Sequence, residues 1–231
     1  MTTIHIDEAV AKQFPDVSVA AVTARGVDGT GTWADAEAAL AGLEADAASG
    51  AWTAPGETDP RIAAWHAVYR DFGTNPRRTR PSVDALCRRL GRNGRLPRVN
   101  APVDAYNSVS VRHVLPAGAF DLDEVHGDIH LRPARDGDVF TPLGEPEATE
   151  QPGPGEVVYA DTTSVLTRHW NHRDADRTKV TADSRAIVFL LESAQGDGGR
   201  ALLAEAAASL TALLTPHAAQ VSWELLGRSD D

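Results

Sequence analysis

The spacing of the apolar residues changes near Gly127, and this change constrains the fold more than any other feature of the sequence. Before it, apolar residues recur at helical spacing: within 61–72, Ile62, Trp65 and Phe72 fall on one helical face. After it, short runs of β-branched residues are separated by turns rich in Pro and Gly, which is typical of strands. The order predicts an α+β fold, in which N-terminal helices are followed by a mostly antiparallel β-sheet or sandwich with flanking helices.

The individual elements follow from the same criteria. We expect helices at residues 33–48, 61–72, 82–90, 100–114 and 200–214. We expect strands at 17–27, 128–133, 139–142, 156–161, 164–168, 178–181, 185–191 and 220–225. The length of 231 residues fits a single compact unit over 1–231.

Composition excludes several classes of protein. One cysteine, Cys87, excludes an internal disulfide framework and a Cys-rich zinc module. No apolar run approaches the roughly 20 residues of a membrane span, and residues 1–5 do not begin a secretory signal. We therefore expect a cytoplasmic protein with no membrane partner.

Positive charge is concentrated in one segment of an acidic chain. The net charge is −11, yet residues 77–98 contain eight arginines and a single acid, Asp84. Guanidinium groups bind phosphate oxygens in bidentate fashion, so the segment predicts an RNA-binding surface. A solvated helix whose arginines pair with acids elsewhere is the alternative, and charge alone does not separate the two. The arginines are Arg77, Arg78, Arg80, Arg88, Arg89, Arg92, Arg95 and Arg98.

Common catalytic motifs are missing, and one polar run stands out. Neither the Gly-x-Ser-x-Gly elbow nor the phosphate-binding loop occurs. Two histidine pairs, at 126/130 and 169/172, lack a third local ligand, which favours structural roles over a metal site. Residues 168–179 combine Trp170, Asn171, two histidines and alternating charges, a mixture that favours a site loop over a plain hairpin. We expect no metal and no cofactor.

Four segments of the chain together form a distinctive pattern. They are Arg98-Val99-Asn100-Ala101-Pro102-Val103-Asp104-Ala105-Tyr106-Asn107, Leu115 to Asp123, Gly127 to Ala134 and Leu190-Leu191-Glu192-Ser193-Ala194. In their order and spacing these segments resemble one family, the tRNA-editing B3/B4 domain of the phenylalanyl-tRNA synthetase β subunit. The similarity covers 61–195, so 1–60 and 196–231 are expected to be a strand-helix and a helix-strand extension. The missing synthetase modules imply a freestanding homologue.

The resemblance implies hydrolysis of the ester between a wrong amino acid and its tRNA, in trans. Glu192 matches the family's site glutamate, which holds the amino-acid side. Gly118 stands where the synthetase has a site histidine, which puts the family's catalytic geometry in doubt. Because water attacks an activated ester, the protein need only position the tRNA end, orient water and stabilise the oxyanion.

The resulting site hypothesis has three groups of residues. The catalytic candidates are Glu192, Asn107, Asn171 and His113. The substrate-binding candidates are Asp104, Asp121, Arg168, Trp170 and Arg173. The eight arginines of 77–98 would contact the tRNA backbone, with no DNA partner expected. Two alternatives remain open: an RNA-binding module without chemistry, and a hydrolase or binder of small, amino-acid-type molecules.

Overall fold

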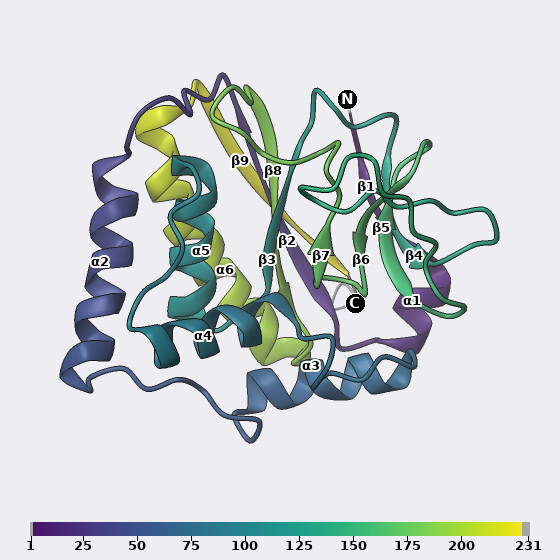
Figure 1. The fold of residues 1–231 in the computed structure, drawn as a ribbon, viewed down its shortest axis with the longest axis horizontal. Helices are drawn as coiled ribbons and strands as arrows, with labels where there is room; N and C mark the ends of the chain where they lie inside the picture. The colour runs from purple at the N-terminus through teal and green to yellow at the C-terminus, as the bar shows by residue number, and fades with distance from the viewer. Residues whose placement is uncertain (1, 228–231) are drawn as a thin grey trace.

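A four-stranded antiparallel sheet lies at the centre of the molecule (Figure 1). The computed structural model describes residues 2–227. The strand order is β3 (Ala117–Asp121), β8 (Ala186–Ser193), β2 (Ser18–Arg25) and β9 (Gln220–Gly227). The N-terminal segment therefore supplies an inner strand, β2, which pairs with β8 along its whole length.

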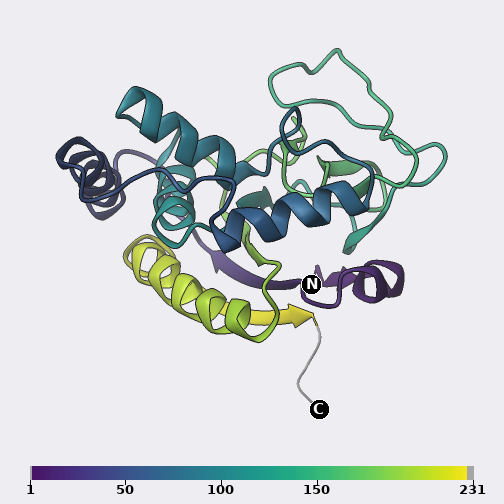
Figure 2. The same cartoon turned by 90° about the horizontal axis from the view of Figure 1, so that it is seen from below.

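Both faces of this sheet are covered, which explains why β2 and β8 are almost continuously apolar. Alternate side chains point to opposite faces of a strand. Ile187 and Phe189 pack on one face against helices α5 and α6, and Val188 and Leu190 pack on the other against a second sheet. Figure 2 shows α6 lying along the sheet beside β9.

The second sheet has five strands in the order β1, β4, β5, β6 and β7. Its bounds are β1 (Ile4–Ile6), β4 (Ile129–Pro133), β5 (Val157–Ala160), β6 (Val165–Arg168) and β7 (Arg173–Asp174). Only β1 runs parallel to its neighbour, β4. The long connection from β4 to β5, residues 134–156, projects from the body of the molecule (Figure 2).

Helices surround the two sheets. They are α1 (Glu8–Gln13), α2 (Ala34–Ser49), α3 (Pro60–Asp71), α4 (Ser82–Asn93), α5 (Ala101–His113) and α6 (Gly196–Leu214), with a 3-10 turn at Thr215–His217. Side-chain caps fix the starts of α3 and α5: Asp59 accepts from the Arg61 amide, and Asn100 accepts from the Val103 amide.

The expected α+β fold with two mostly antiparallel sheets and flanking helices is confirmed. Two predicted strands are wrong. At 139–142 only isolated bridges form, and Pro142 has no amide hydrogen for a ladder. At 178–181 the Thr178 carbonyl accepts from the amide of Asp121, at the end of β3, and the Val180 carbonyl accepts from the Asn100 side chain, so no continuous ladder forms. The sequence does not predict the elements β1, α1, β3 and β7.

Candidate functional site

Strand periodicity places Glu192 between the two sheets. Val188 and Leu190 already point toward the second sheet, so Glu192, two residues further along β8, points the same way. Gly118 on the adjacent β3 lies opposite Leu190. A carboxyl group and a residue without a side chain thus come together in the layer between the sheets.

Three neutral donors hold the Glu192 carboxyl, which is only 2% exposed. Tyr159 Oη donates to Oε1. Trp170 Nε1 donates to the same oxygen at 3.0 Å, and Asn171 Nδ2 donates to Oε2 at 2.6 Å. Burial raises the pKa of Glu192 to about 7 despite these bonds, since among residues 2–227 no cation lies close enough to compensate the ionised form.

The turn that carries Trp170 and Asn171 has an unusual backbone. His169 and Trp170 have φ values of 47° and 67°, in the left-handed region that residues with a Cβ seldom adopt. Glu156 holds this turn, since its Oε1 accepts from the His169 amide at 2.9 Å and its carboxylate also binds Arg168. Such conformations cluster at functional sites, where surrounding contacts stabilise them.

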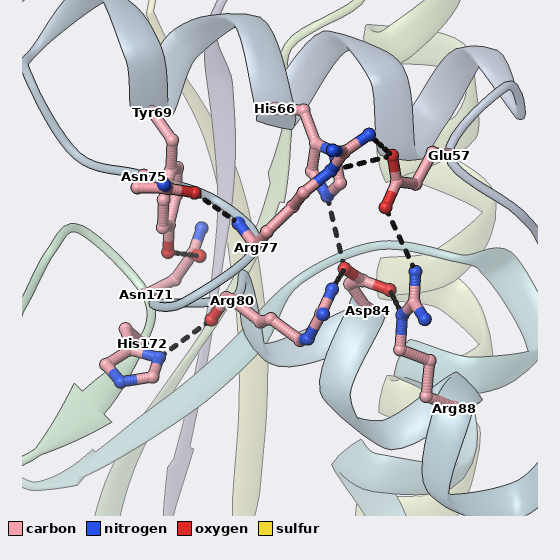
Figure 3. A network of polar contacts seen from close by, with 10 residues as sticks. All are labelled: Glu57, His66, Tyr69, Asn75, Arg77, Arg80, Asp84, Arg88, Asn171 and His172. Atoms are coloured by element: carbon pink, nitrogen blue, oxygen red, sulfur yellow. Dashed lines mark hydrogen bonds and ion pairs between the residues drawn. The ribbon is translucent and has the colours of Figure 1, made fainter. Parts of the chain in front are cut away.

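Helices α3 and α4 hold the turn from its other side (Figure 3). Tyr69 Oη donates to Asn171 Oδ1 at 2.7 Å, and the Ser82 amide donates to the Asn171 carbonyl at 3.1 Å. His172 Nδ1 donates to the Arg80 carbonyl at 2.8 Å. Both the side chain and the backbone of Asn171 are therefore fixed, with its amide directed at Glu192.

A buried carboxylate anchors α4 against α3 (Figure 3). Asp84, 1% exposed, accepts from Arg88 at 2.7 Å and Arg80 at 3.0 Å, and His66 Nε2 lies 3.1 Å from it. Burial acts to raise the pKa of Asp84, but these hydrogen bonds outweigh it and hold that pKa below its ordinary value. Because Arg80 also contacts His172, the network connects the helix pair to the site turn.

A cavity of about 50 Å³ opens beside Glu192. It holds a second carboxyl, Asp174, whose Oδ1 accepts from Thr167 Oγ1 at 2.9 Å. Burial raises the pKa of Asp174 to about 6, and the charge of Asp174 in turn raises the pKa of Glu192. The lining residues are Ser82, Ala117, Gly118, Phe120, Tyr159, Thr167, Trp170, Asn171, His172, Asp174, Leu190 and Glu192.

Three of the predicted site residues meet at this cavity: Glu192, Asn171 and Trp170. Sequence reasoning missed Tyr159 and Asp174. Tyr159 reads as an ordinary strand residue. Asp174 lies within the polar run of residues 168–179, and that run is the feature of the sequence that could have pointed to it.

Four other candidates lie among structural contacts away from the cavity lining. Asn107 is buried in α5, and His113 Nε2 bonds to Ser209 Oγ at 3.2 Å. Asp104 accepts from the Val99 amide at 2.9 Å, and Asp121 accepts from Ser184 Oγ. Burial raises the pKa of Asp104 and lowers that of His113.

Arg168 and Arg173 bind acids of the 134–156 connection. Arg168 donates to Glu156 at 2.8 and 2.9 Å and to Glu150 at 2.6 Å. Arg173 donates to Glu150 at 3.2 Å and to Glu145 at 2.6 Å. These pairs hold the projecting connection against β6 and β7, and neither arginine lines the cavity.

The arginine segment divides into two sets. Four members form ion pairs: Arg77 with Glu57, Arg80 and Arg88 with Asp84, and Arg98 with Glu37 and Glu44. The other four are exposed, and among residues 2–227 no ion pair engages them. This exposed set comprises Arg78, Arg89, Arg92 and Arg95.

The histidine pairs make protein contacts. His130 Nδ1 bonds to Asp7 at 3.0 Å, His126 bonds to Thr163 Oγ1, and His169 Nδ1 lies 3.0 Å from Thr74 Oγ1. Within residues 2–227, no three His, Cys, Asp or Glu side chains are grouped to hold a metal ion. In the same residues no helix combines the length and apolar character needed to cross a membrane.

A comparison with models of known protein families identifies the family of this chain. A family model described as the B3/4 domain matches residues 64–203, which is more than half of the chain. The chain belongs to the B3/4 domain family. The expected family is thus confirmed, and the match begins and ends somewhat later than the predicted 61–195. It includes both Glu192 and the turn that holds it.

A solved structure is also similar to this B3/4 protein: an N-terminal fragment of the phenylalanyl-tRNA synthetase β-subunit from Pyrococcus horikoshii. The two are 13% identical with a TM-score of 0.47, over 97% of this chain and 50% of that one. The present chain therefore spans half the length of that fragment. A search of curated proteins finds no match.

Proposed function

We propose that this chain hydrolyses the aminoacyl ester of mischarged tRNA, acting in trans. The observation that carries the proposal is Glu192. In a B3/4 domain, this buried carboxyl lies beside a cavity, is held by three neutral donors and has no cationic partner among residues 2–227. It is the residue that the family resemblance assigns to the amino-acid side of the substrate.

Hydrolysis of the ester requires the side chains mainly to position the aminoacyl group and the attacking water. The oxygen of a water molecule attacks the ester carbonyl carbon, and the bond from that carbon to the ribose oxygen breaks. The ribose oxygen takes up a proton, leaving free amino acid and tRNA with its terminal hydroxyl restored. Glu192 and Asn171 hold the aminoacyl group, and the Ser82 and Thr167 hydroxyls at the cavity supply polar partners for water.

The exposed arginines give the nucleic acid a path away from the cavity. Helix α4 begins at Ser82, a cavity residue, and carries Arg89 and Arg92 on its exposed side. At about 1.5 Å per residue, these lie roughly 10 to 15 Å along the helix from Ser82. A tRNA whose 3′ end enters the cavity would bring backbone phosphates to this distance.

A deacylation screen tests the hydrolase. Correctly and wrongly charged tRNAs would be mixed with the wild type, with Glu192→Gln and with Glu205→Gln, a matched change at an exposed α6 glutamate. The proposal expects selective ester loss on few species, abolished by Glu192→Gln and unaffected by Glu205→Gln. Equal turnover by all three proteins would refute the role of Glu192.

Reversing the charge of the exposed α4 arginines distinguishes an enzyme that acts on tRNA from a binding module and from a small-molecule hydrolase. Arg89→Glu with Arg92→Glu should weaken tRNA binding and flatten its dependence on salt, whereas Arg112→Glu, at an exposed α5 arginine, should not. Arg88 is unsuitable for this test because it pairs with Asp84. Salt-sensitive binding without turnover would favour a binding module. Turnover indifferent to Arg89 and Arg92 would favour a small-molecule hydrolase.

A further inference from the structure

Gly118 leaves an open space in the cavity wall that no backbone requirement explains. A Cβ built on Gly118 meets no heavy atom within 4 Å, and the residue does not adopt a positive φ. Sterically, other residues are therefore permitted at this position on β3. Its effect in this chain is to keep open the part of the cavity beside Leu190 and Glu192.

Three buried aromatic side chains form much of the remaining wall, and the volume between the walls limits the size of a ligand. Phe120, Tyr159 and Trp170 are each no more than 2% exposed and pack in the core between the sheets. A cavity needs roughly 10 to 15 Å³ for each water molecule, so about 50 Å³ admits a group equivalent to roughly four waters. That space suits a short side chain with its amino group and is too small for an aromatic ring.

The polar groups of the cavity complement a positive charge. In the part of the chain that the structure describes, the Glu192 carboxyl receives hydrogen bonds from neutral donors only, and the one bond to the Asp174 carboxyl comes from the neutral Thr167 hydroxyl. Within residues 2–227 no hydrogen bond or ion pair reaches Oδ2 of Asp174. Two carboxyls that share a cavity and lack a cation favour an ammonium group between them.

We infer that the cavity binds the ammonium group and short side chain of a small amino acid such as glycine, alanine or serine. Gly118 provides the space for that group, and Asp174 is a second carboxyl facing its charge. The inference rests on the proposed function and narrows it: the substrate would be a tRNA ester of a small amino acid. Gly118 and Asp174 thereby become specificity-determining residues.

Calorimetric titration with amino-acid amides tests the inference without requiring hydrolysis. The probes are glycinamide, alaninamide, phenylalaninamide and lactamide, the last having a hydroxyl in place of the ammonium. We expect alaninamide to bind the wild type at least about tenfold more tightly than phenylalaninamide or lactamide. Equal binding of either of these, or no saturable binding of any probe, would overturn the inference.

Variants locate the binding. Gly118→Leu and Asp174→Asn should each weaken alaninamide binding about tenfold or more, and Gly118→Ala should weaken it less. Because the added methyl of Gly118→Ala meets nothing within 4 Å, that variant keeps the test valid if the leucine variant misfolds. Gly56→Leu, at an exposed glycine with equally open surroundings, is the control and should bind normally. Unchanged binding in the Gly118 and Asp174 variants would contradict the assignment.

The two proposals fail in different ways. Alaninamide binding with no deacylation of any charged tRNA would leave this inference standing and remove the hydrolase. Deacylation selective for aromatic amino acids would keep the hydrolase and overturn the inference.

Discussion

Replacing Glu192 by glutamine should change how stability depends on pH. The pKa of the Glu192 carboxyl is about 7 in the folded protein, whereas its ordinary value is 4.5. As the pH rises, the unfolded chain therefore releases the carboxyl proton at a lower pH than the folded protein does. Between these two pKa values the folded protein keeps a proton that the unfolded chain has released, so the free energy of unfolding of the wild type falls as the pH rises. Each unit of pKa difference corresponds to about 1.4 kcal/mol, which gives a loss of about 3 kcal/mol.

The sign of this effect is opposite to that of a carboxylate stabilised by a salt bridge. The contribution of Glu192 to the unfolding free energy is fully present below about pH 4.5 and is lost by about pH 7. Glutamine does not titrate, so Glu192→Gln lacks this component while every other group still titrates. The difference between the two proteins therefore reports the titration of Glu192 together with its coupling to Asp174.

Urea unfolding of both proteins between about pH 4 and pH 8 measures the effect. The unfolding free energy of the wild type minus that of Glu192→Gln should fall by about 3 kcal/mol across this range. Repeating the pair in an Asp174→Asn background should reduce the fall, because the Asp174 charge helps to raise the pKa of Glu192. A difference that is constant with pH, or that rises, would refute the buried and uncompensated placement of Glu192.

Three further predictions concern residues around the site. Tyr69→Phe removes the donor to Asn171 Oδ1 and should lower the unfolding free energy by about 1 to 2 kcal/mol in urea titrations; an unchanged midpoint would count against that bond. Asp84→Asn leaves two arginines and a histidine around an uncharged amide and should cost about 2 to 3 kcal/mol by the same assay, whereas a cost near zero would contradict the network. Burial raises the pKa of the Cys87 thiol to about 12, so alkylation followed by mass spectrometry should label it only on unfolding, and rapid labelling of the native protein would disprove its placement.

Local periodicity accounts for what the sequence predicted of the fold. Helix α3 and strands β2 and β8 are long enough to display their spacing, and they were found. The three residues of β1 and the six of α1 are too short to display a period. Sheet order was also out of reach, because β2 pairs with two strands more than 150 residues further along the chain.

The site was partly predictable for a similar reason. Glu192 and Asn171 were found through a family motif and an unusual polar run. Asp174 becomes a cavity residue only because β7 pairs with β6, which sets it beside Thr167. That pairing cannot be read from a run in which several charged residues look alike.

The number of arginines in residues 77–98 overstates the positive charge that this segment leaves unpaired. Four of its eight arginines are matched by acids at 37, 44, 57 and 84. Three of these acids lie outside the segment, on or near helices packed against it. The segment therefore combines an internal salt-bridge network with a smaller exposed surface, and RNA binding by the exposed arginines stays a prediction.

The most direct test of the proposed hydrolase is the initial rate of ester hydrolysis on a tRNA mischarged with a labelled small amino acid. The wild type should release the amino acid well above the spontaneous rate, and Glu192→Gln should reduce release to near that rate while still binding the tRNA. Release at the wild-type rate by Glu192→Gln, or no release by the wild type on any charged tRNA, would contradict the account.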